Sequence, residues 1–332
     1  MYKRQLEHDL GCTHHVTPMP TVSDSKRIEI AFDMCGYVRD TVTSYLELSK
    51  INTPLKPVFT PYLIDEETGA ENEGLHSKVA MAVLAKLLYC ARLARPDFML
   101  AINLLSRNLT TWTVFHDRAL LRLMSYAHYS ANFMLRGYVG SDLPSLDLYP
   151  DADHAGCKKT SRSTSGIWLE ISTGSESTFP IDWSSKRQGS VAFSTPEAEI
   201  VSLESALKDF GIPARSLMQV AAINKGLREG ALPLSMLTET VTGVTPPINH
   251  KVPMTIFEDN TATIVIASKG RSPALRHLNK THRISIMWVA EVVNDPSIKL
   301  THCPTLEQKG DGFTKQLDRV KFQSMLQQLN IR

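Results

Sequence analysis

The spacing of apolar residues divides the chain into a largely helical first part and a second part in which strands and helices alternate. From His76 to about Gly140, apolar residues recur every three or four positions, as in KVAMAVLAKLLYCARLA, which is typical of amphipathic helices. After Gly140, three segments have the length and composition of consecutive strands: LDLYPDAD (146–153), GIWLEIST (166–173) and STFPIDWSS (177–185).

A long helix is expected to begin at Ser194-Thr195-Pro196, because Ser and Thr are preferred N-caps and Pro suits the first helical turn. The sequence then predicts a strand at 254–259, helices at 260–269 and 281–293, a strand at 298–303 and a closing helix from about residue 310. This order, βββαβααβα, implies an α/β fold with a mixed sheet covered by helices.

The first part of the chain opens with a strand-like segment, RIEIAF (27–32), and a helical one at 33–50. The Pro-bearing segment 52–63 is expected to be extended. Residues 65–74, DEETGAENEG, are acidic and polar, and we expect them to form an exposed linker.

Composition describes an ordinary globular protein, with 42% hydrophobic and 21% charged residues. The net charge of +2 does not by itself indicate a nucleic-acid partner, so such a partner must be argued from local clusters. The five cysteines form no CxxC pair, which fits neither a disulfide framework nor a zinc site. The sequence has no signal peptide and no apolar run of about 18 residues. We therefore expect an intracellular protein, cytoplasmic or nuclear, that is neither secreted nor bound to a membrane.

Four acidic residues lie at the ends of predicted elements, where α/β folds assemble their sites. Asp151 and Asp259 end two strands, Glu199 lies in the first turn of the long helix, and Asp311 lies at the start of the closing helix. Clustered carboxylates need a cation, and oxygen ligands select Mg²⁺ or Mn²⁺. Two such ions about 3.5–4 Å apart catalyse phosphoryl displacement. On spacing alone, solvated helix caps are the favoured interpretation, because a chain with 34 acidic residues places several near element boundaries by chance.

The same residues lie within motifs that resemble the ribonuclease H region of copia-type LTR retrotransposon polyproteins. That family shows runs similar to YSDADWAG, RSTSG, WSSKKQ, SSTEAEY, a CDN box and AD-x-x-TK. The corresponding segments here are YPDADHAG (149–156), SRSTSGIWL (161–169), WSSKRQGSVAFSTPEAEI (183–200), FEDNTATI (257–264) and GDGFTKQL (310–317).

The resemblance implies a ribonuclease H-like fold, a mixed five-stranded sheet flanked by helices. It also implies an enzyme that cuts the RNA strand of RNA/DNA hybrids with two Mg²⁺ ions, for which Mn²⁺ is a possible substitute. Its four catalytic and metal-binding carboxylates fall on Asp151, Glu199, Asp259 and Asp311. Asp153 is expected to be a turn residue or a supporting acceptor.

Two departures from the family pattern concern the backbone. Pro150 removes a hydrogen-bond donor from a predicted central strand. Gly310 and Gly312 flank Asp311, and because glycine weakens a helix by about 1 kcal/mol, this ligand is expected to be loosely held.

Upstream segments resemble other parts of the same polyproteins. Residues 90–107 resemble the helical connection between polymerase and ribonuclease H, and 36–63 more loosely resemble the polymerase thumb. The chain has no adjacent Asp-Asp pair, so it is expected to lack the polymerase centre, with palm and fingers supplied by the parent polyprotein. The predicted parts are a partial thumb-like segment with linker (1–74), a helical connection (75–140) and a ribonuclease H-like domain (141–332).

Candidate nucleic-acid contacts lie on loops around the predicted site. We expect the basic segment 268–283 and a second basic group that includes Lys186 and Arg187 to contact phosphates. For the segment 268–283, a solvated surface loop is an equal alternative. Ser194 and Thr195 are candidates for reading the 2′-hydroxyl of RNA, and helix capping explains at least one of them. The basic residues singled out are Arg271, Arg276, Lys280, Lys186 and Arg187.

Two other functions remain open at this stage. The first is a non-catalytic nucleic-acid-binding remnant of a decayed element. The second is a related strand-transfer enzyme, which the acid order D-E-D-D disfavours because such enzymes use D-D-E.

Overall fold

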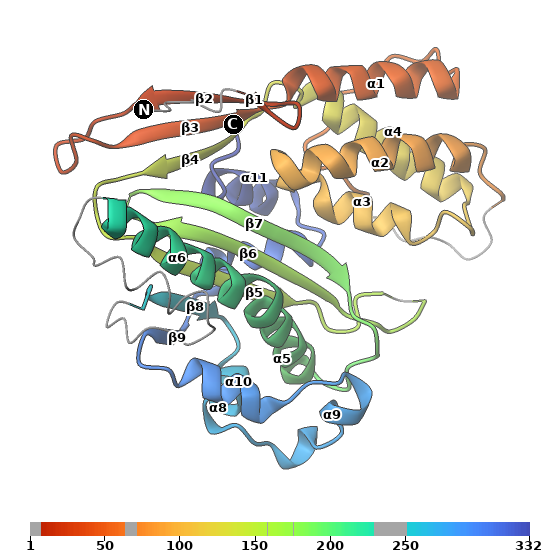
Figure 1. Ribbon diagram of the computed structural model, residues 1–332. Helices are drawn as coiled ribbons and strands as arrows, with labels where there is room; N and C mark the ends of the chain where they lie inside the picture. Colours follow the sequence, from red (N-terminus) through yellow and green to blue (C-terminus); the bar gives the residue numbers. More distant parts are fainter. Residues whose placement is uncertain (1–7, 64–71, 158, 175, 229–250) are drawn as a thin grey trace.

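The computed structural model describes residues 8–63, 72–157, 159–174, 176–228 and 251–332 (Figure 1). Residues 65–71 of the predicted linker lie outside this part of the chain. The described residues form two sheets with helices packed around them.

The larger sheet is the mixed five-stranded sheet expected from the sequence, in the order β7-β6-β5-β8-β9. Strands β5, β6 and β7 are antiparallel neighbours, whereas β8 pairs in parallel with both β5 and β9. All five predicted strands are confirmed: β5 (Ser145–Ala152), β6 (Thr164–Ser172), β7 (Thr178–Arg187), β8 (Met254–Glu258) and β9 (Ile298–His302).

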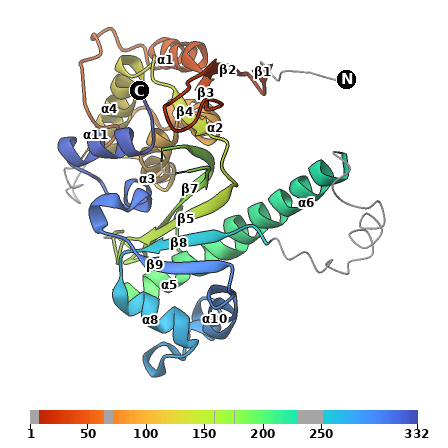
Figure 2. The ribbon, with the colours of Figure 1, turned by 90° about the vertical axis from the view of Figure 1, so that its left-hand side faces the viewer.

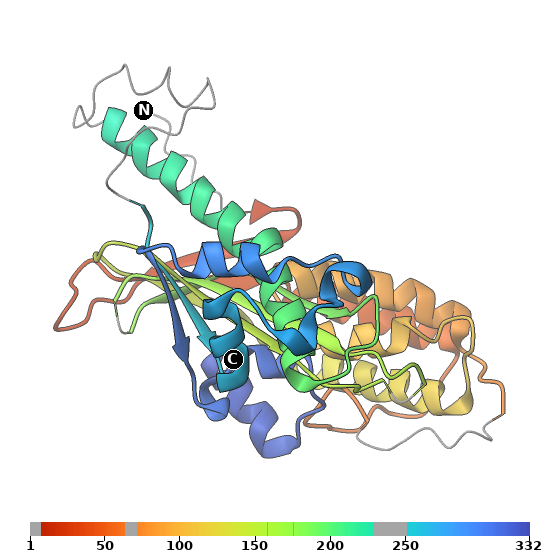
Figure 3. The same ribbon diagram turned by 90° about the horizontal axis from the view of Figure 1, so that it is seen from below.

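Helices cover both faces of this sheet. The predicted long helix is confirmed as α5 (Thr195–Ser205), a π-helical turn (Ala206–Gly211) and α6 (Ile212–Arg228), which extends beyond the sheet edge (Figures 2 and 3). Together with α5, two later helices, α8 (Thr261–Lys269) and α10 (Ile286–Val293), contribute to one core. On the opposite side lies α11 (Arg319–Gln328) (Figure 1).

Alternation along β5 separates the two cores. Leu146 and Leu148 pack on the α5 side, whereas Tyr149 faces the other side. There Trp168 stacks on Trp183 with ring centroids 5.5 Å apart, and both indoles are buried in the core.

The first part of the chain combines a helical layer with a small antiparallel sheet. Its helices are α1 (Cys35–Ser49), α2 (Ser77–Leu93), α3 (Met99–Ser106) and α4 (Val114–Tyr129), and its strands are β1 (His8–Asp9), β2 (Cys12–Pro18), β3 (Ile28–Asp33) and β4 (Leu135–Val139) in that order. The strand at 27–32 and the helix at 33–50 were predicted to within two residues.

The prediction of a helical pattern up to residue 140 is wrong at its end. Residues 135–139 form β4, which pairs with β3 through partners such as Ile30 and Gly137. Five residues are too few to establish a period of two or of 3.6, so pairing with β3 decides the conformation. Strand β2 was not predicted at all, because its CTHHVTP sequence is polar and mostly exposed.

The helical layer shares a core with the five-stranded sheet. Buried side chains of α2, α3 and α4 lie in one cluster with Trp168, Trp183 and Phe313. The Trp183 indole N–H donates to the carbonyl of Ala91 in α2 at 2.7 Å. Within this layer, buried Arg95 donates two hydrogen bonds to Asp97, at 2.9 and 2.7 Å.

Among the described residues, no helix has the length and apolar character needed to cross a membrane.

Candidate active site

The four predicted carboxylates converge at one edge of the five-stranded sheet. Asp151, Asp259 and Asp311 form one triad, and Glu199 and Asp259 form a second with Glu258. Within each triad, one oxygen from each residue lies within 4.8 Å of the others. Asp259 therefore belongs to both groups.

The parallel pairing of β5 and β8 explains this convergence, because the carboxyl ends of parallel strands meet at the same edge. Their register ends at Leu148 and Ile256, beyond which the two strands diverge. The side chain of Gln308 fills the gap, donating to the carbonyl of Pro150 at 3.1 Å and to that of Phe257 at 2.9 Å. Asp151 and Asp259 thus lie on either side of an opening in the sheet.

Pro150 costs the central strand no hydrogen bond. In a strand, the nitrogen and the carbonyl of one residue face the same side. The Pro150 carbonyl meets Gln308 on the side where pairing with β8 has already ended. The missing N–H would have had no ladder partner there, so the conflict expected from the sequence does not arise.

Asp311 is presented by a tight turn and not by the start of a helix. Residues Lys309–Phe313 form a 3-10 turn, and α11 begins only at Arg319, which corrects the predicted closing helix from about residue 310. A Cβ at Gly310 would lie 2.8 Å from the Cβ of Asp151, so only glycine lets the turn approach β5 this closely. The helical premise behind the expected loose hold on Asp311 is therefore wrong, because the two glycines lie in a turn and not in a helix.

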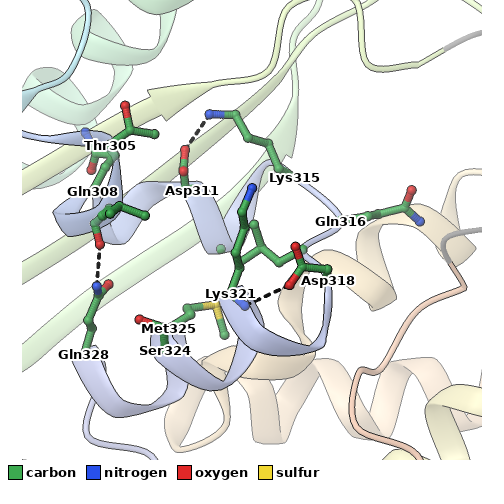
Figure 4. A pocket seen from close by; sticks show the side chains of 13 residues that line it. Thr305, Gln308, Asp311, Lys315, Gln316, Asp318, Lys321, Ser324, Met325 and Gln328 are labelled. Atoms are coloured by element: carbon green, nitrogen blue, oxygen red, sulfur yellow. Dashed lines mark hydrogen bonds and ion pairs between the residues drawn. The ribbon is translucent and has the colours of Figure 1, made fainter.

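Lys315 and Thr314 hold the first triad together. The Lys315 ammonium lies 2.5 Å from Asp311 Oδ1 (Figure 4). It lies 3.4 Å from Asp151 Oδ1. The Thr314 hydroxyl donates to Asp151 Oδ2. Burial alone would lower the pKa of Lys315, but the charges of Asp151 and Asp311 raise it above its ordinary value. Lys315 therefore acts as a tethered cation between the two carboxylates.

Among the described residues, no cation lies within ion-pair distance of Glu199 or Glu258, although the charge of Lys315 acts on both at longer range. Glu199 and Glu258 are buried, and the Oε2 atom of each has no hydrogen-bond partner in the part of the chain that the structure describes. Buried carboxylate oxygens without partners are costly unless they are protonated or bind a cation. An all-oxygen set of this kind fits Mg²⁺ or Mn²⁺.

Burial shifts the titration of these acids. It raises the pKa of Asp151 to about 7, although Lys315 acts in the opposite direction. Burial, and after it the charges of Asp151 and Glu258, raise the pKa of Glu199 well above its usual range. Burial likewise raises the pKa of Glu258. Protons therefore compete with cations for these oxygens.

Two cavities flank the carboxylates. An open one is lined by Thr195, Glu199, Asp259 and Lys315, among others. The second lies on the α11 side and is lined by Asp311, Lys315 and Lys321, with Gln308 and Gln328 also on its wall (Figure 4). Lys315 lies between the two cavities.

Ser194 and Thr195, the two hydroxyl residues singled out from the sequence, have different positions in the structure. The Ser194 hydroxyl caps α5 by accepting from the Glu197 amide at 3.3 Å, as the alternative interpretation expected. Thr195 is exposed and lines the open cavity. Glu199 lies one turn into α5, a turn later than predicted. Asp153 accepts a hydrogen bond from the Thr164 amide, which agrees with a supporting acceptor.

The basic segment is anchored beside α5. Glu197 is fully buried and pairs with His277 at 2.9 Å and with His282 at 3.4 Å. These contacts leave three predicted basic side chains exposed to solvent: Arg271, Arg276 and Lys280.

The second basic group, Lys186 and Arg187, lies at the end of β7. These two residues line one cavity with His282 and Arg283. Arg271, Arg276 and Lys280 are not among the residues that line it. The structure thus brings the two basic groups together only through the end of the segment.

Sequence reasoning missed Glu258, Thr314 and Lys315. Glu258 immediately precedes Asp259, so a pair of adjacent acids at a strand end was visible in the sequence. Lys315 follows Asp311 by four residues, the spacing at which opposite charges interact on a helical turn. The spacing was available but was not used.

Comparisons with known proteins show that the chain is similar to transposon Pol polyproteins. The retrovirus-related Pol polyprotein from transposon RE1 of Arabidopsis thaliana is 29% identical over 251 residues, 75% of this chain and 14% of the relative. That from transposon TNT 1-94 of Nicotiana tabacum is 27% identical over 258 residues, 77% of this chain and 17% of the relative. The Pol polyprotein from transposon RE2 of Arabidopsis thaliana is 26% identical over 284 residues, which are 83% of this chain and 17% of the relative.

The homologues of this chain are retrovirus-related Pol polyproteins of plant transposons. The chain spans only 14–17% of their length, so the match does not say which of their activities it carries. No protein-family model matches the sequence. The resemblance to a retrotransposon polyprotein is therefore confirmed, whereas its ribonuclease H part stays a prediction.

Replacing Lys315 with Met should destabilise the metal-free protein. The change leaves Asp151 and Asp311 without their cation, and breaking a buried ion pair costs about 3–5 kcal/mol. Because the Lys315 side chain is 40% exposed, we expect about 1–3 kcal/mol, measured by urea unfolding in EDTA. Millimolar Mg²⁺ should restore most of this loss. Lys321→Met, on the same cavity, is the control; equal losses in both variants would contradict the assignment.

Stability in EDTA should fall as the pH rises from about 4 to 7. The folded-state pKa of Asp151 is about 7 against an ordinary 3.8, so in this window the folded protein holds a proton that the unfolded chain has released. Raising the pH therefore favours unfolding. Mg²⁺ should flatten the profile because cations replace the protons, and Asp151→Asn should reduce it. Urea unfolding at several pH values tests this; an EDTA profile that rises over the window would refute it.

Proposed function

We propose that this chain is a metal-dependent endonuclease that hydrolyses the RNA strand of RNA/DNA hybrids and forms the C-terminal piece of a transposon Pol polyprotein. The observation that carries the proposal is the convergence of Asp151, Glu199, Asp259 and Asp311 at one edge of a mixed five-stranded sheet. The Pol polyprotein homologues support it, and palm and fingers of the parent polyprotein are the partners we propose.

The residues have distinct roles in this proposal. When bound, two divalent cations would activate a water molecule and stabilise the leaving 3′ oxygen. Asp259 is suited to bridge the two ions, since it belongs to both triads. Thr314 fixes one oxygen of Asp151, which orients the other toward the triad. Gln308 keeps the sheet open between Asp151 and Asp259.

Contacts to the nucleic acid would come from the surface around this edge. Arg271, Arg276 and Lys280 are exposed beside α5, and Lys186 and Arg187 lie at the end of β7. Charges of this kind contact phosphates without reading the base sequence. Thr195 lines the open cavity together with Glu199, and we propose that its hydroxyl contacts a 2′-hydroxyl of the RNA strand.

Neutralising single carboxylates should abolish cleavage without unfolding the protein. Asp151→Asn and Glu199→Gln should each remove nearly all cutting of a labelled RNA/DNA hybrid in Mg²⁺, and the double variant should lose little more, because ligands of shared ions act as a unit. Products should carry 5′-phosphate and 3′-hydroxyl ends, and duplex DNA should stay intact. Asp147→Asn, on the same strand and face but outside both triads, is the control. Full activity in Asp151→Asn would refute the assignment of these carboxylates, whereas the absence of any cleavage by the unmodified protein would favour a non-catalytic binding protein.

Binding to the hybrid should depend on salt through the basic segment. Each phosphate neutralised adds about −0.9 to the slope of log K against log salt for B-form DNA. Replacing Arg271, Arg276 and Lys280 with Ala should make this slope shallower by up to about 2–3 and raise KM while sparing kcat. Fluorescence anisotropy over a salt series measures the slope. An unchanged slope would mean that the segment is only solvated surface.

A further inference from the structure

Glu258 is a buried acid whose surroundings leave one of its oxygens without a partner. It ends β8, where its backbone carbonyl accepts from the Cys303 amide at 3.0 Å. Its Oε1 atom accepts from the Asn260 amide at 3.2 Å, which fixes the carboxylate in the turn after the strand. Its Oε2 atom has no partner among the described residues, although the side chain is fully buried.

Glu258 and Glu199 belong to the same triad, and each has one carboxylate oxygen without a partner among the described residues. One oxygen each of Glu258, Glu199 and Asp259 lies within 4.8 Å of the other two, and Glu199 Oε2 also lacks a partner in the described structure. In that part of the chain, no lysine, arginine or histidine forms an ion pair with Glu199 or Glu258. Lys315 contacts Asp151 and Asp311 instead.

The two triads therefore differ in how their charge is balanced. The first has a tethered ammonium at 2.5 and 3.4 Å, whereas the second has three carboxylates and no cation at contact distance among the described residues. Three acids this close cannot all ionise without a positive charge between them. A divalent cation supplies that charge and gives both free oxygens a partner.

We propose that Glu258 is a fifth metal ligand, which holds a second divalent cation together with Glu199 and Asp259. The inference rests on the proposed function, because it adds a ligand to the same centre. In the family box that FEDN resembles, a cysteine stands at this position, so this chain replaces a soft thiol with a hard carboxylate. The added charge strengthens the second site, which loads in the absence of nucleic acid.

Metal stoichiometry of the full chain tests this assignment without any nuclease assay. Titration with Mn²⁺, followed by calorimetry and by the electron paramagnetic resonance of free Mn²⁺, should show two sites in the unmodified protein. Glu258→Gln keeps the shape and removes the charge. It should retain one site and weaken the other by at least about 10–100-fold, the loss that follows even from changing a group behind a ligand.

Two further variants control this experiment. Glu258→Cys restores the residue of the resembling box and should also lose the second site, which keeps the test open if Glu258→Gln does not fold. Glu197→Gln removes an equally buried carboxylate from the same helix as Glu199, but one that pairs with His277, and should leave both sites intact. A folded Glu258 variant that binds two Mn²⁺ ions with unchanged affinity would overturn the proposal and make Glu258 a buried neutral acid.

The outcome is separable from that of the proposed function. If the unmodified protein binds two Mn²⁺ ions, loses one in Glu258→Gln, and yet cuts no hybrid, the ligand assignment stands and the nuclease proposal fails. If Glu258→Gln binds metal and cuts hybrid as the unmodified protein does, the nuclease proposal stands and the fifth ligand is rejected.

Discussion

Electrostatic repulsion among buried carboxylates is the constraint around which this end of the molecule is organised. Asp151, Glu199 and Glu258 are almost completely buried, and Asp259 joins them to Asp311. Such a group destabilises the folded chain unless cations or protons balance it. The Lys315 ammonium and the Thr314 hydroxyl give Asp151 partners and so offset part of this repulsion. Gly310 lets the 3-10 turn approach β5 closely, which brings Asp311 into the group.

Lys315 gives the site two alternative ways to be neutral. Its ammonium holds Asp151 and Asp311 together when no metal occupies the first triad. A divalent cation there would take over the same oxygens, and repulsion would then drive the ammonium toward one of the two cavities it lines. The side chain is 40% exposed, so this movement does not require the fold to open. Metal loading and the position of Lys315 are therefore linked.

Much of this arrangement could be predicted from the sequence, for reasons that differ from element to element. The strands of the larger sheet have enough length and apolar character to be recognised, and the ordered motifs identified the four carboxylates. Strand β4 was missed because pairing with β3 decides its conformation. The turn around Asp311 was mistaken for a helix because the role of its two glycines depends on tertiary contacts. Gly310 lets the turn approach β5 and Gly312 lets it approach α11, and neither contact can be read from the sequence. Glu258 and Lys315 carried a signal in the sequence, an acid next to Asp259 and a four-residue spacing from Asp311, but only their burial and partners identify them as part of the site.

The helical layer also supports the turn that carries Asp311. In α3, the Asn103 amide donates to the Ser185 carbonyl at 2.9 Å, and the Ser185 hydroxyl donates to the Phe313 carbonyl at 2.6 Å. A parallel route runs from Arg107 to the Thr164 hydroxyl at 3.0 Å, and the Thr164 amide in turn donates to Asp153. Each link is a satisfied hydrogen bond between rigid elements, and the shared core behind them excludes water. If the proposed cations bind here, a fixed turn holds Asp311 within the small displacements that metal ligands tolerate, in spite of the two glycines beside it.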